Sequence, residues 1–262
     1  GKSLTSGEAN VHIGVNAGCS AAASHNRNVH IGACAGKSST TTNDNVIIGP
    51  FILGCASGFT GNYNVLIGRA AGCCLSSGTQ NIFLGQGSGN KTTTGGRNIA
   101  IGGFDALSAN TTGGCNIALG GNALASANAS HNIALGQSAG TDVTSGNCNI
   151  FLGCQAGFNA TTADDSIFMG SCAGGGGTVT GNDNIALGAS AGKELTSGAS
   201  NIFIGEESGK ESQTGINNAF IGKGAAGNGA VTGNSNIALG EAAGFKMTSG
   251  GCNVFIGKNA AF

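Results

Sequence analysis

The sequence contains no tryptophan, one proline and one tyrosine, and charged residues make up only 9% of its 262 positions. Glycine, in contrast, occurs 51 times. This composition does not match an ordinary enzyme domain. A single proline and the lack of an every-third glycine pattern exclude a collagen helix and a proline-rich linker. We therefore expect the glycines to mark short turns in a repetitive structure.

Long apolar runs are also missing. Apolar runs such as the one at Val46–Ile48 contain only three residues, whereas a membrane-spanning helix needs about 20. We therefore predict no membrane span. The net charge of -1, with scattered Lys and Arg, provides no basic stripe for phosphates, so nucleic acid is not an expected partner. Because the sequence starts without Met or a leader, we expect a processed product or a fragment.

A five-residue unit, N-[IV]-x-[ILM]-G, recurs along the whole chain at spacings of sixteen to nineteen residues. Its fifth position is glycine in every copy, from Gly14 to Gly257. Self-similarity at a nearly fixed period predicts a repeat architecture. The fifteen anchor positions are Asn10, Asn28, Asn45, Asn64, Asn81, Asn98, Asn116, Asn132, Asn149, Ser166, Asn184, Asn201, Asn218, Asn236 and Asn253.

The pattern inside each repeat predicts an all-β fold. Glycine every four to six residues breaks any helix of useful length, and the apolar residues at positions two and four suit short strands. We expect a single β-solenoid (a parallel β-helix or β-roll) of about fifteen 17-residue coils, continuous over residues 1–262 and uncapped at both ends. We expect positions two and four to point inward, with small residues at position eight (Ala71, Ala139, Ala191, Ala243) and aliphatic residues near position twelve (Leu75, Val143, Leu195).

The anchor residues predict a ladder in the core. Each of the fourteen anchor Asn side chains would bond to its equivalent one coil away or cap the turn backbone, and Ser166 would replace it only in part. The alternative is that Asn is used because it tolerates a left-handed turn conformation.

Position three would then point outward, because side chains alternate along a strand. No repeat carries a charge there. An apolar row of this kind usually marks an association surface, and we predict lateral self-association with Phe anchors. In the alternative, a flattened coil, position three points inward. The chain also ends near the repeat position at which it starts, which favours head-to-tail stacking. The predicted anchors are Phe83, Phe151, Phe168, Phe203, Phe220 and Phe255.

Two repeats carry a family resemblance. Residues 98–114 read N-I-A-I-G-G-F-D-A-L-S-A-N-T-T-G-G, and residues 116–124 read N-I-A-L-G-G-N-A-L. They resemble the N-T-A-I-G-x-x-A-L-x-x-N-T-T-G-x-x repeats of phage tail-fibre and bacterial surface proteins, and are similar to the repeats of trimeric autotransporter adhesin heads. The resemblance implies a shaft or an adhesive head, commonly trimeric, located outside the cell or on a virion or cell surface.

The ten cysteines form no C-x-x-C pair, which favours disulfides in an oxidising compartment over zinc or redox chemistry. A column just before the anchor holds cysteines too far apart to pair within one molecule, so they would bridge chains or remain buried thiols. The column contains Cys115, Cys148 and Cys252, and the candidate disulfides within one chain are Cys55 with Cys74 and Cys154 with Cys172.

Other chemistry is sparse. The sequons that begin at Asn90, Asn110, Asn128 and Asn159 are candidate glycosylation sites, although a chain rich in Asn, Ser and Thr also produces sequons by chance. His12 and His30 share position three of successive coils, but two ligands make a poor metal site. We therefore expect no metal, no cofactor, no catalytic residue and no enzymatic activity.

The leading functional hypothesis is a structural subunit or shaft of an extracellular fibre, filament or adhesin. Such a chain would assemble with itself laterally, head to tail or in both ways, and a surface receptor or glycan is the further partner that this role allows. The alternative is an ice-binding β-solenoid, because Thr recurs near position thirteen. These threonines are Thr5, Thr94, Thr111, Thr144, Thr196 and Thr248.

Overall fold

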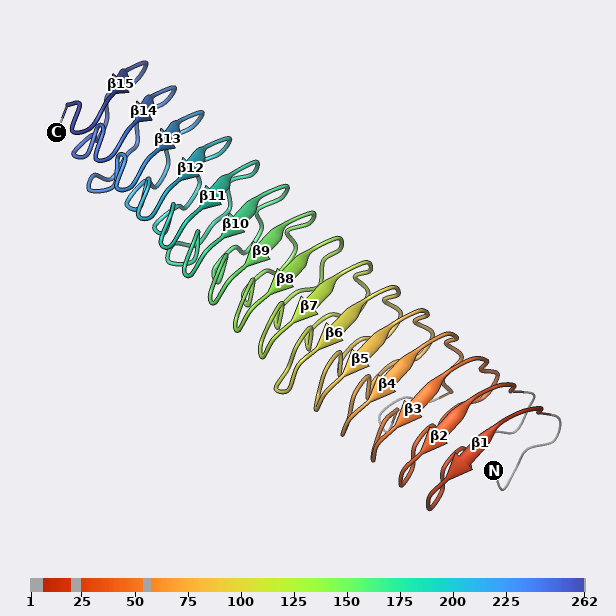
Figure 1. Cartoon of the computed structure of the whole chain (residues 1–262). Helices are drawn as coiled ribbons and strands as arrows, with labels where there is room; N and C mark the ends of the chain where they lie inside the picture. The colour runs from red at the N-terminus through yellow and green to blue at the C-terminus, as the bar shows by residue number, and fades with distance from the viewer. Residues whose placement is uncertain (1–6, 20–24, 54–57, 262) are drawn as a thin grey trace. The chain divides into compact units, whose positions relative to one another are not determined.

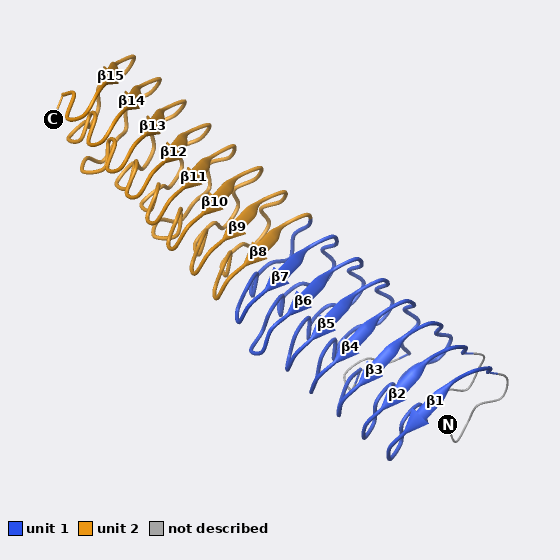
Figure 2. Cartoon of the chain, viewed as in Figure 1, with its two compact units in different colours: residues 1–130 blue, residues 131–262 orange. Residues whose placement is uncertain are grey.

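The computed structural model describes residues 7–19, 25–53 and 58–261, and within these ranges it has fifteen short β-strands and no helix (Figure 1). The predicted all-β solenoid fold is confirmed. The chain divides into two compact units, residues 1–130 and 131–262 (Figure 2). Each unit by itself is a stack of coils with one strand per coil.

Every strand covers positions two to four of a repeat. The first unit contains β1 (Val11–Ile13), β2 (Val29–Ile31), β3 (Val46–Ile48), β4 (Val65–Ile67), β5 (Ile82–Leu84), β6 (Ile99–Ile101) and β7 (Ile117–Leu119). The second contains β8 (Ile133–Leu135), β9 (Ile150–Leu152), β10 (Ile167–Met169), β11 (Ile185–Leu187), β12 (Ile202–Ile204), β13 (Ala219–Ile221), β14 (Ile237–Leu239) and β15 (Val254–Ile256).

Within each unit, neighbouring strands pair in parallel and in register. In β12 and β13, for example, Phe203 lies opposite Phe220. The backbone N–H at position two donates to the anchor carbonyl of the next coil, as Ile202 does to Asn218 at 2.8 Å. Because every coil pairs with the next one in this way, residues at equivalent positions form columns through the stack.

The glycine at position five is required by this close stacking. Gly205 has a φ of +125°, and a Cβ atom at this position would lie 2.6 Å from the carbonyl oxygen of Gly222 in the next coil. Any side chain would therefore be strained by the backbone angle and would also collide with backbone atoms that cannot move aside. Glycine is thus required at position five for steric reasons, in addition to its role in the turn.

The anchor asparagines form a ladder in the interior. The Nδ2 group of Asn201 donates to Asn184 Oδ1 at 3.1 Å and to the Gly215 carbonyl at 2.7 Å, and its backbone N–H donates to the same Oδ1. Asn201 is fully buried. The left-handed alternative is wrong for the anchor itself, because positive φ occurs one residue earlier, as at Ser200 with 56°. The anchor is therefore used for its hydrogen bonds.

Ser166 keeps only part of this ladder. Its backbone N–H still donates to Asn149 Oδ1 at 2.9 Å, and its hydroxyl oxygen accepts the backbone N–H of Asn184 at 3.2 Å. The hydroxyl donates to the nearby Asp164 carbonyl instead of reaching the previous coil. The side-chain bond between neighbouring coils is thus missing at this step.

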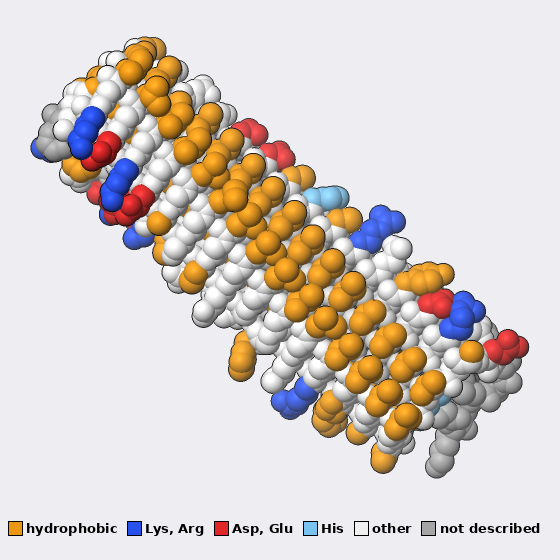
Figure 3. Space-filling model, in the orientation of Figure 1, with side chains coloured by type: hydrophobic (Ala, Val, Ile, Leu, Met, Phe, Trp, Pro, Cys, Tyr) orange, Lys and Arg blue, Asp and Glu red, His pale blue; other side chains and the backbone are white. Residues whose placement is uncertain are grey.

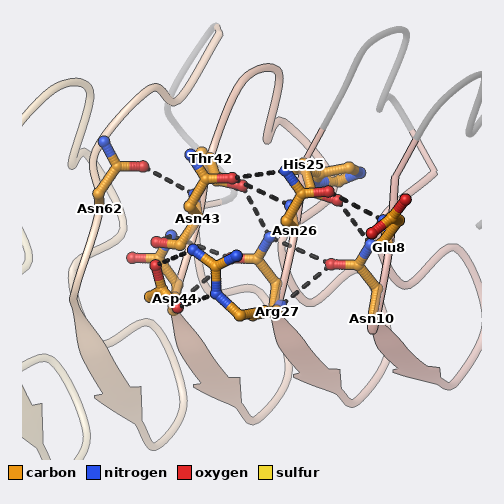
Figure 4. A network of polar contacts seen from close by, with 11 residues as sticks. Glu8, Asn10, His25, Asn26, Arg27, Thr42, Asn43, Asp44 and Asn62 are labelled. Atoms are coloured by element: carbon orange, nitrogen blue, oxygen red, sulfur yellow. Dashed lines mark hydrogen bonds and ion pairs between the residues drawn. The ribbon is translucent and has the colours of Figure 1, made fainter.

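A second polar column lies two residues before the anchor (Figure 4). The backbone N–H of Asn26 donates to Asn43 Oδ1 at 3.1 Å, and that of Asn43 donates to Asn62 Oδ1 at 2.7 Å. Farther along the chain, the backbone N–H of Asn147 donates to Asp164 Oδ1. This column could not be recognised in the sequence, because the residue type at its position varies between repeats.

The interior of each coil is lined by position three, and the prediction that positions two and four point inward is wrong. With the anchor Asn buried at position one, strand alternation places position three inside and positions two and four outside. The flattened-coil alternative is correct in this respect. The buried residues at positions eight and twelve, such as Ala191 and Leu195, were predicted correctly.

The predicted Phe anchors are therefore not on the surface. Five of them are 0% exposed, and the sixth, Phe255 in β15, is partly buried. A buried ring cannot contact another molecule, so these residues stabilise the coil interior and do not mediate association. The fully buried residues are Phe83, Phe151, Phe168, Phe203 and Phe220.

Side-chain size at position three is matched by the residue across the coil. The Phe168 ring occupies the space in which a Cβ atom on Gly174 would lie, only 2.6 Å from Cδ2 of the ring. Where position three is Ala118, the buried Leu124 lies six residues later in place of that glycine. Phe168 with Gly174 and Ala118 with Leu124 are two complementary pairs of this kind. Where both residues are small, as at Ala186 and Gly192, the Phe203 ring of the next coil fills the space, and a Cβ atom on Gly192 would lie 2.6 Å from Cδ2 of that ring.

We predict that completing the ladder stabilises the protein. The Ser166→Asn substitution should restore the missing side-chain hydrogen bond and raise the free energy of unfolding by about 1 kcal/mol. The matched Asn201→Ala substitution should lower it by about 3 kcal/mol, because it leaves the Gly215 carbonyl and the backbone N–H of Asn218 without their partner. Urea unfolding followed by circular dichroism measures both changes. Equal stability of Asn201→Ala and the wild-type protein would contradict this role of the ladder.

Candidate functional site: an apolar sheet face

Positions two and four of every repeat point away from the coil interior and form two columns on the outer face of the sheet. Position two is Ile or Val in every repeat except at Ala219, and position four is Ile or Leu except at Met169. Many of these side chains are exposed, from 36% at Ile204 to 67% at Ile256, and the others are mostly half-buried. We call these two columns the apolar face.

The apolar face is regular and carries no charge. In the space-filling view, rows of hydrophobic side chains run over the strands of each unit (Figure 3). Because the strands are paired in register, successive side chains in a column are spaced by the strand separation of about 4.8 Å. A contiguous apolar surface of this kind is unusual on a monomeric soluble protein and usually marks a contact site.

Charged residues gather in the turns. Glu206 pairs with Lys223 at 2.9 Å, and Glu241 pairs with Lys258 at 3.0 Å. Each pair links equivalent positions of successive coils, one residue after the position-five glycine. Both pairs are exposed and contribute little to stability individually. Their position confines charge to the turns and leaves the sheet face apolar.

Three histidines lie together inside the first coils of unit 1. The ring centroids of His12, His25 and His30 are 4.8 to 6.1 Å apart. All six ring nitrogens are buried, and none of them has a hydrogen-bond partner among the residues that the structure describes. The sequence placed His12 and His30 in one column but gave no indication of His25, which lies three residues before the anchor Asn28 and is buried. Among the described residues, no three His, Cys, Asp or Glu side chains are placed to hold a metal ion.

Burial determines the charge state of these rings. Loss of solvent lowers the pKa of His30 to about 3, and repulsion from His12 and His25 adds to this effect. The pKa of His12 and that of His25 are lowered as well, again mainly by burial. The cluster is therefore neutral at pH 7, where it packs as three aromatic rings, and His12 and His30 occupy the position that Phe holds in other coils.

The cysteines do not form the predicted disulfide between Cys154 and Cys172, and both are free thiols. Cys172 occupies the column of Gln155, not that of Cys154, and its Sγ lies 3.5 Å from Gln155 Oε1. The one-residue offset directs the two sulfur atoms to different places. Of the other predicted pair, Cys55 lies outside the described residues.

In the column just before the anchor, Cys148 and Cys252 are exposed and Cys115 is half-buried. The alternative of buried thiols is therefore wrong for Cys148 and Cys252. Bridges between chains through this column stay a prediction.

The candidate glycosylation sites differ in accessibility. Asn110 is fully buried and its Nδ2 donates to the Gly113 carbonyl at 2.9 Å, so this prediction is wrong for the folded chain. Asn159 is half-buried, and its Nδ2 donates to the Gly176 carbonyl. Asn90 is half-buried too, whereas Asn128 is exposed and uses only its Oδ1, as an acceptor from Thr111 and its neighbour. Asn128 is thus the most accessible of the four.

The threonine column is engaged within the protein. The hydroxyl of Thr144 donates to the Thr161 carbonyl at 2.9 Å, and that of Thr196 donates to the Gln213 carbonyl at 3.0 Å. Each bond joins one coil to the next. The hydroxyls of Thr144 and Thr196 therefore help to hold successive coils together, whereas Thr5 lies outside the described residues.

Comparison with known proteins gives no assignment, because no protein-family model and no curated protein matches the sequence. The described part of the chain also contains no helix long and apolar enough to cross a membrane.

We predict that the histidine cluster makes unit 1 sensitive to acid. The folded His30 has a pKa of about 3, whereas an unfolded His has one of about 6.5. The unfolded state therefore takes up more protons as pH falls from 6.5 towards 3, and stability is lost over this window. Between pH 6.5 and 4.5 the loss from His30 should be roughly 2 to 3 kcal/mol.

The control is His30→Phe, which places at position three the residue found there in other coils. Urea unfolding at pH 6.5 and pH 4.5 should show a smaller loss of unfolding free energy in the variant, because it lacks the His30 imidazole. The carboxylates that also titrate in this range are common to both proteins, so their effect cancels in the comparison. Identical pH dependence of the two proteins would contradict a role for the cluster.

Proposed function

We propose that the chain is a structural subunit that associates with further copies of itself through the apolar face. The observation that carries this proposal is the charge-free pair of columns at positions two and four. Self-association was predicted at position three, and the proposal moves the contact to the neighbouring positions of the same strands. The proposed role involves no catalysis.

A second copy of the chain is the partner that fits this face best. Apolar side chains in each column repeat at about 4.8 Å, the strand spacing. Only a surface with the same period can fit its side chains between these rows along the whole length of a unit, and another copy has that period. The absence of charge at positions two and four also means that two identical faces do not repel each other.

The size of the face explains why many coils are needed. The eight strands of unit 2 present roughly 450 Å², taking about 4.8 Å for each coil and about 12 Å for the width. A stable interface needs about 800 Å² from each partner. A few coils therefore bind weakly, and affinity increases with coil number. This dependence suits a shaft or filament built from many repeats.

The proposed setting is a fibre, filament or adhesin outside the cell or on a virion or cell surface. This part of the proposal is supported by the resemblance of residues 98–114 and 116–124 to tail-fibre and surface-protein repeats. The ice-binding alternative receives less support, because Thr144 and Thr196 use their hydroxyl hydrogens for bonds between coils.

We predict that charge on the apolar face prevents association. Replacing Ile202 and Ile204 by Lys should weaken association more than about 100-fold, since burying an unpaired charge costs several kcal/mol. Sedimentation velocity at micromolar concentrations should show oligomers for the wild-type protein and monomers for the double variant.

The control is Ser197→Lys, which adds charge at an exposed position of the preceding coil away from the apolar face. It should leave the oligomer intact. A monomeric wild-type protein, or a double variant as oligomeric as the control, would refute the proposal.

A further inference from the structure

The turn that follows β6 departs from the regular coil. In the preceding coil, two residues separate the position-five Gly85 from the buried Ser88. In this coil, three residues separate the equivalent Gly102 from the buried Ala106. Backbone pairing is regular again at Ala106, whose carbonyl accepts the N–H of Gly89 at 2.9 Å. The extra residue is therefore accommodated in the segment from Gly103 to Asp105, which bulges outward.

This bulge is strained and displays an aromatic ring. Phe104 and Asp105 are two successive non-glycine residues in the left-handed conformation, with φ values of 56° and 63°. Residues other than glycine rarely adopt this conformation, because the Cβ atom then lies too close to the following carbonyl oxygen. Phe104 is also 76% exposed. Strain combined with an exposed aromatic side chain is a feature of binding sites more than of a simple coil.

A cavity of about 310 Å³ lies beside the bulge, lined by Arg69, Ala70, Gln86, Gly87, Asn90, Phe104 and Asp105. Its floor includes Gly87, where a Cβ atom would lie 3.2 Å from Asp105 Oδ1. The missing side chain thus keeps the space in front of that carboxylate open. The volume lies at the lower end of the range for small-molecule sites and suits one sugar ring.

The polar side chains of this cavity have hydrogen-bond donors and acceptors that are not used within the protein. Among the described residues, the Arg69 and Asp105 side chains form no ion pair and no hydrogen bond, although both line one cavity. The exposed Gln86 side chain adds an amide group to the same lining. An arginine, a carboxylate and an amide are therefore available to a ligand that carries a carboxylate and several hydroxyl groups.

We propose that this cavity binds a single acidic sugar residue of the hexuronic acid type. The apolar face of the sugar ring packs on Phe104, and its carboxylate pairs with the planar guanidinium of Arg69. Its hydroxyl groups donate to the Asp105 carboxylate and to the amide oxygen of Gln86. The site does not depend on association through the apolar face.

The test is an NMR titration of the full chain, produced in a host that does not glycosylate Asn90. Methyl glucuronide should bind with a dissociation constant on the order of 1 mM, and methyl glucoside at least 10-fold more weakly. Phe104→Ala should weaken binding of methyl glucuronide at least 10-fold. Arg69→Gln should abolish the preference for the acid and leave the weak binding of the neutral sugar unchanged.

Phe51→Ala is the matched control, because Phe51 is an exposed Phe at the same repeat position with a φ of 60°, outside the cavity. It should bind methyl glucuronide like the wild-type protein. Thermal melting of all variants verifies that they are folded, as expected for changes at exposed side chains. No saturable binding by the wild-type protein, equal affinity for both sugars, or equal losses in Phe51→Ala and Phe104→Ala would overturn the proposal.

Discussion

Hydrogen bonding between successive coils is the constraint on which the rest of this structure depends. The coils are held at one strand spacing by backbone bonds such as that from Ile202 to Asn218, and Asn201 Oδ1 accepts two further donors from the next coil. Every side chain must therefore tolerate a near-identical neighbour directly above and below. Glycine meets this demand at position five, and a buried amide that is both donor and acceptor meets it at the anchor.

Both surfaces of the sheet follow from that constraint. A buried anchor places position three inside, where the Phe168 ring is accommodated by Gly174 and Ala118 is complemented by Leu124, so that the thin core remains filled. Positions two and four are then left outside, and their aliphatic side chains form the apolar face. Both proposed functions use surfaces that the stacking leaves exposed. The apolar face would bind further copies of the chain, and the irregular turn at Phe104 would bind a sugar.

The repeat, the strand-by-strand stacking and the roles of the anchor and Leu195 could be predicted from the sequence, because each is fixed by local periodicity. The direction of position three could not be deduced from hydrophobicity alone, since positions two, three and four are all apolar. The signal that could have decided it was the pairing of Phe168 with Gly174 within one repeat. The cavity beside Phe104 depends on a single-residue difference in turn length, and His25 stands at a position where most repeats have Gly or Ala. Neither feature has a periodic signal.

The central claim, that each coil pairs in register with the next, is tested most directly by NMR couplings across hydrogen bonds in the deuterated protein. The account predicts a coupling from the Ile202 amide to the Asn218 carbonyl, and equivalent couplings one repeat apart within each unit. Couplings between residues four apart within one repeat, as in a helix, would contradict this pairing. Couplings between strands that are several repeats apart would contradict it as well.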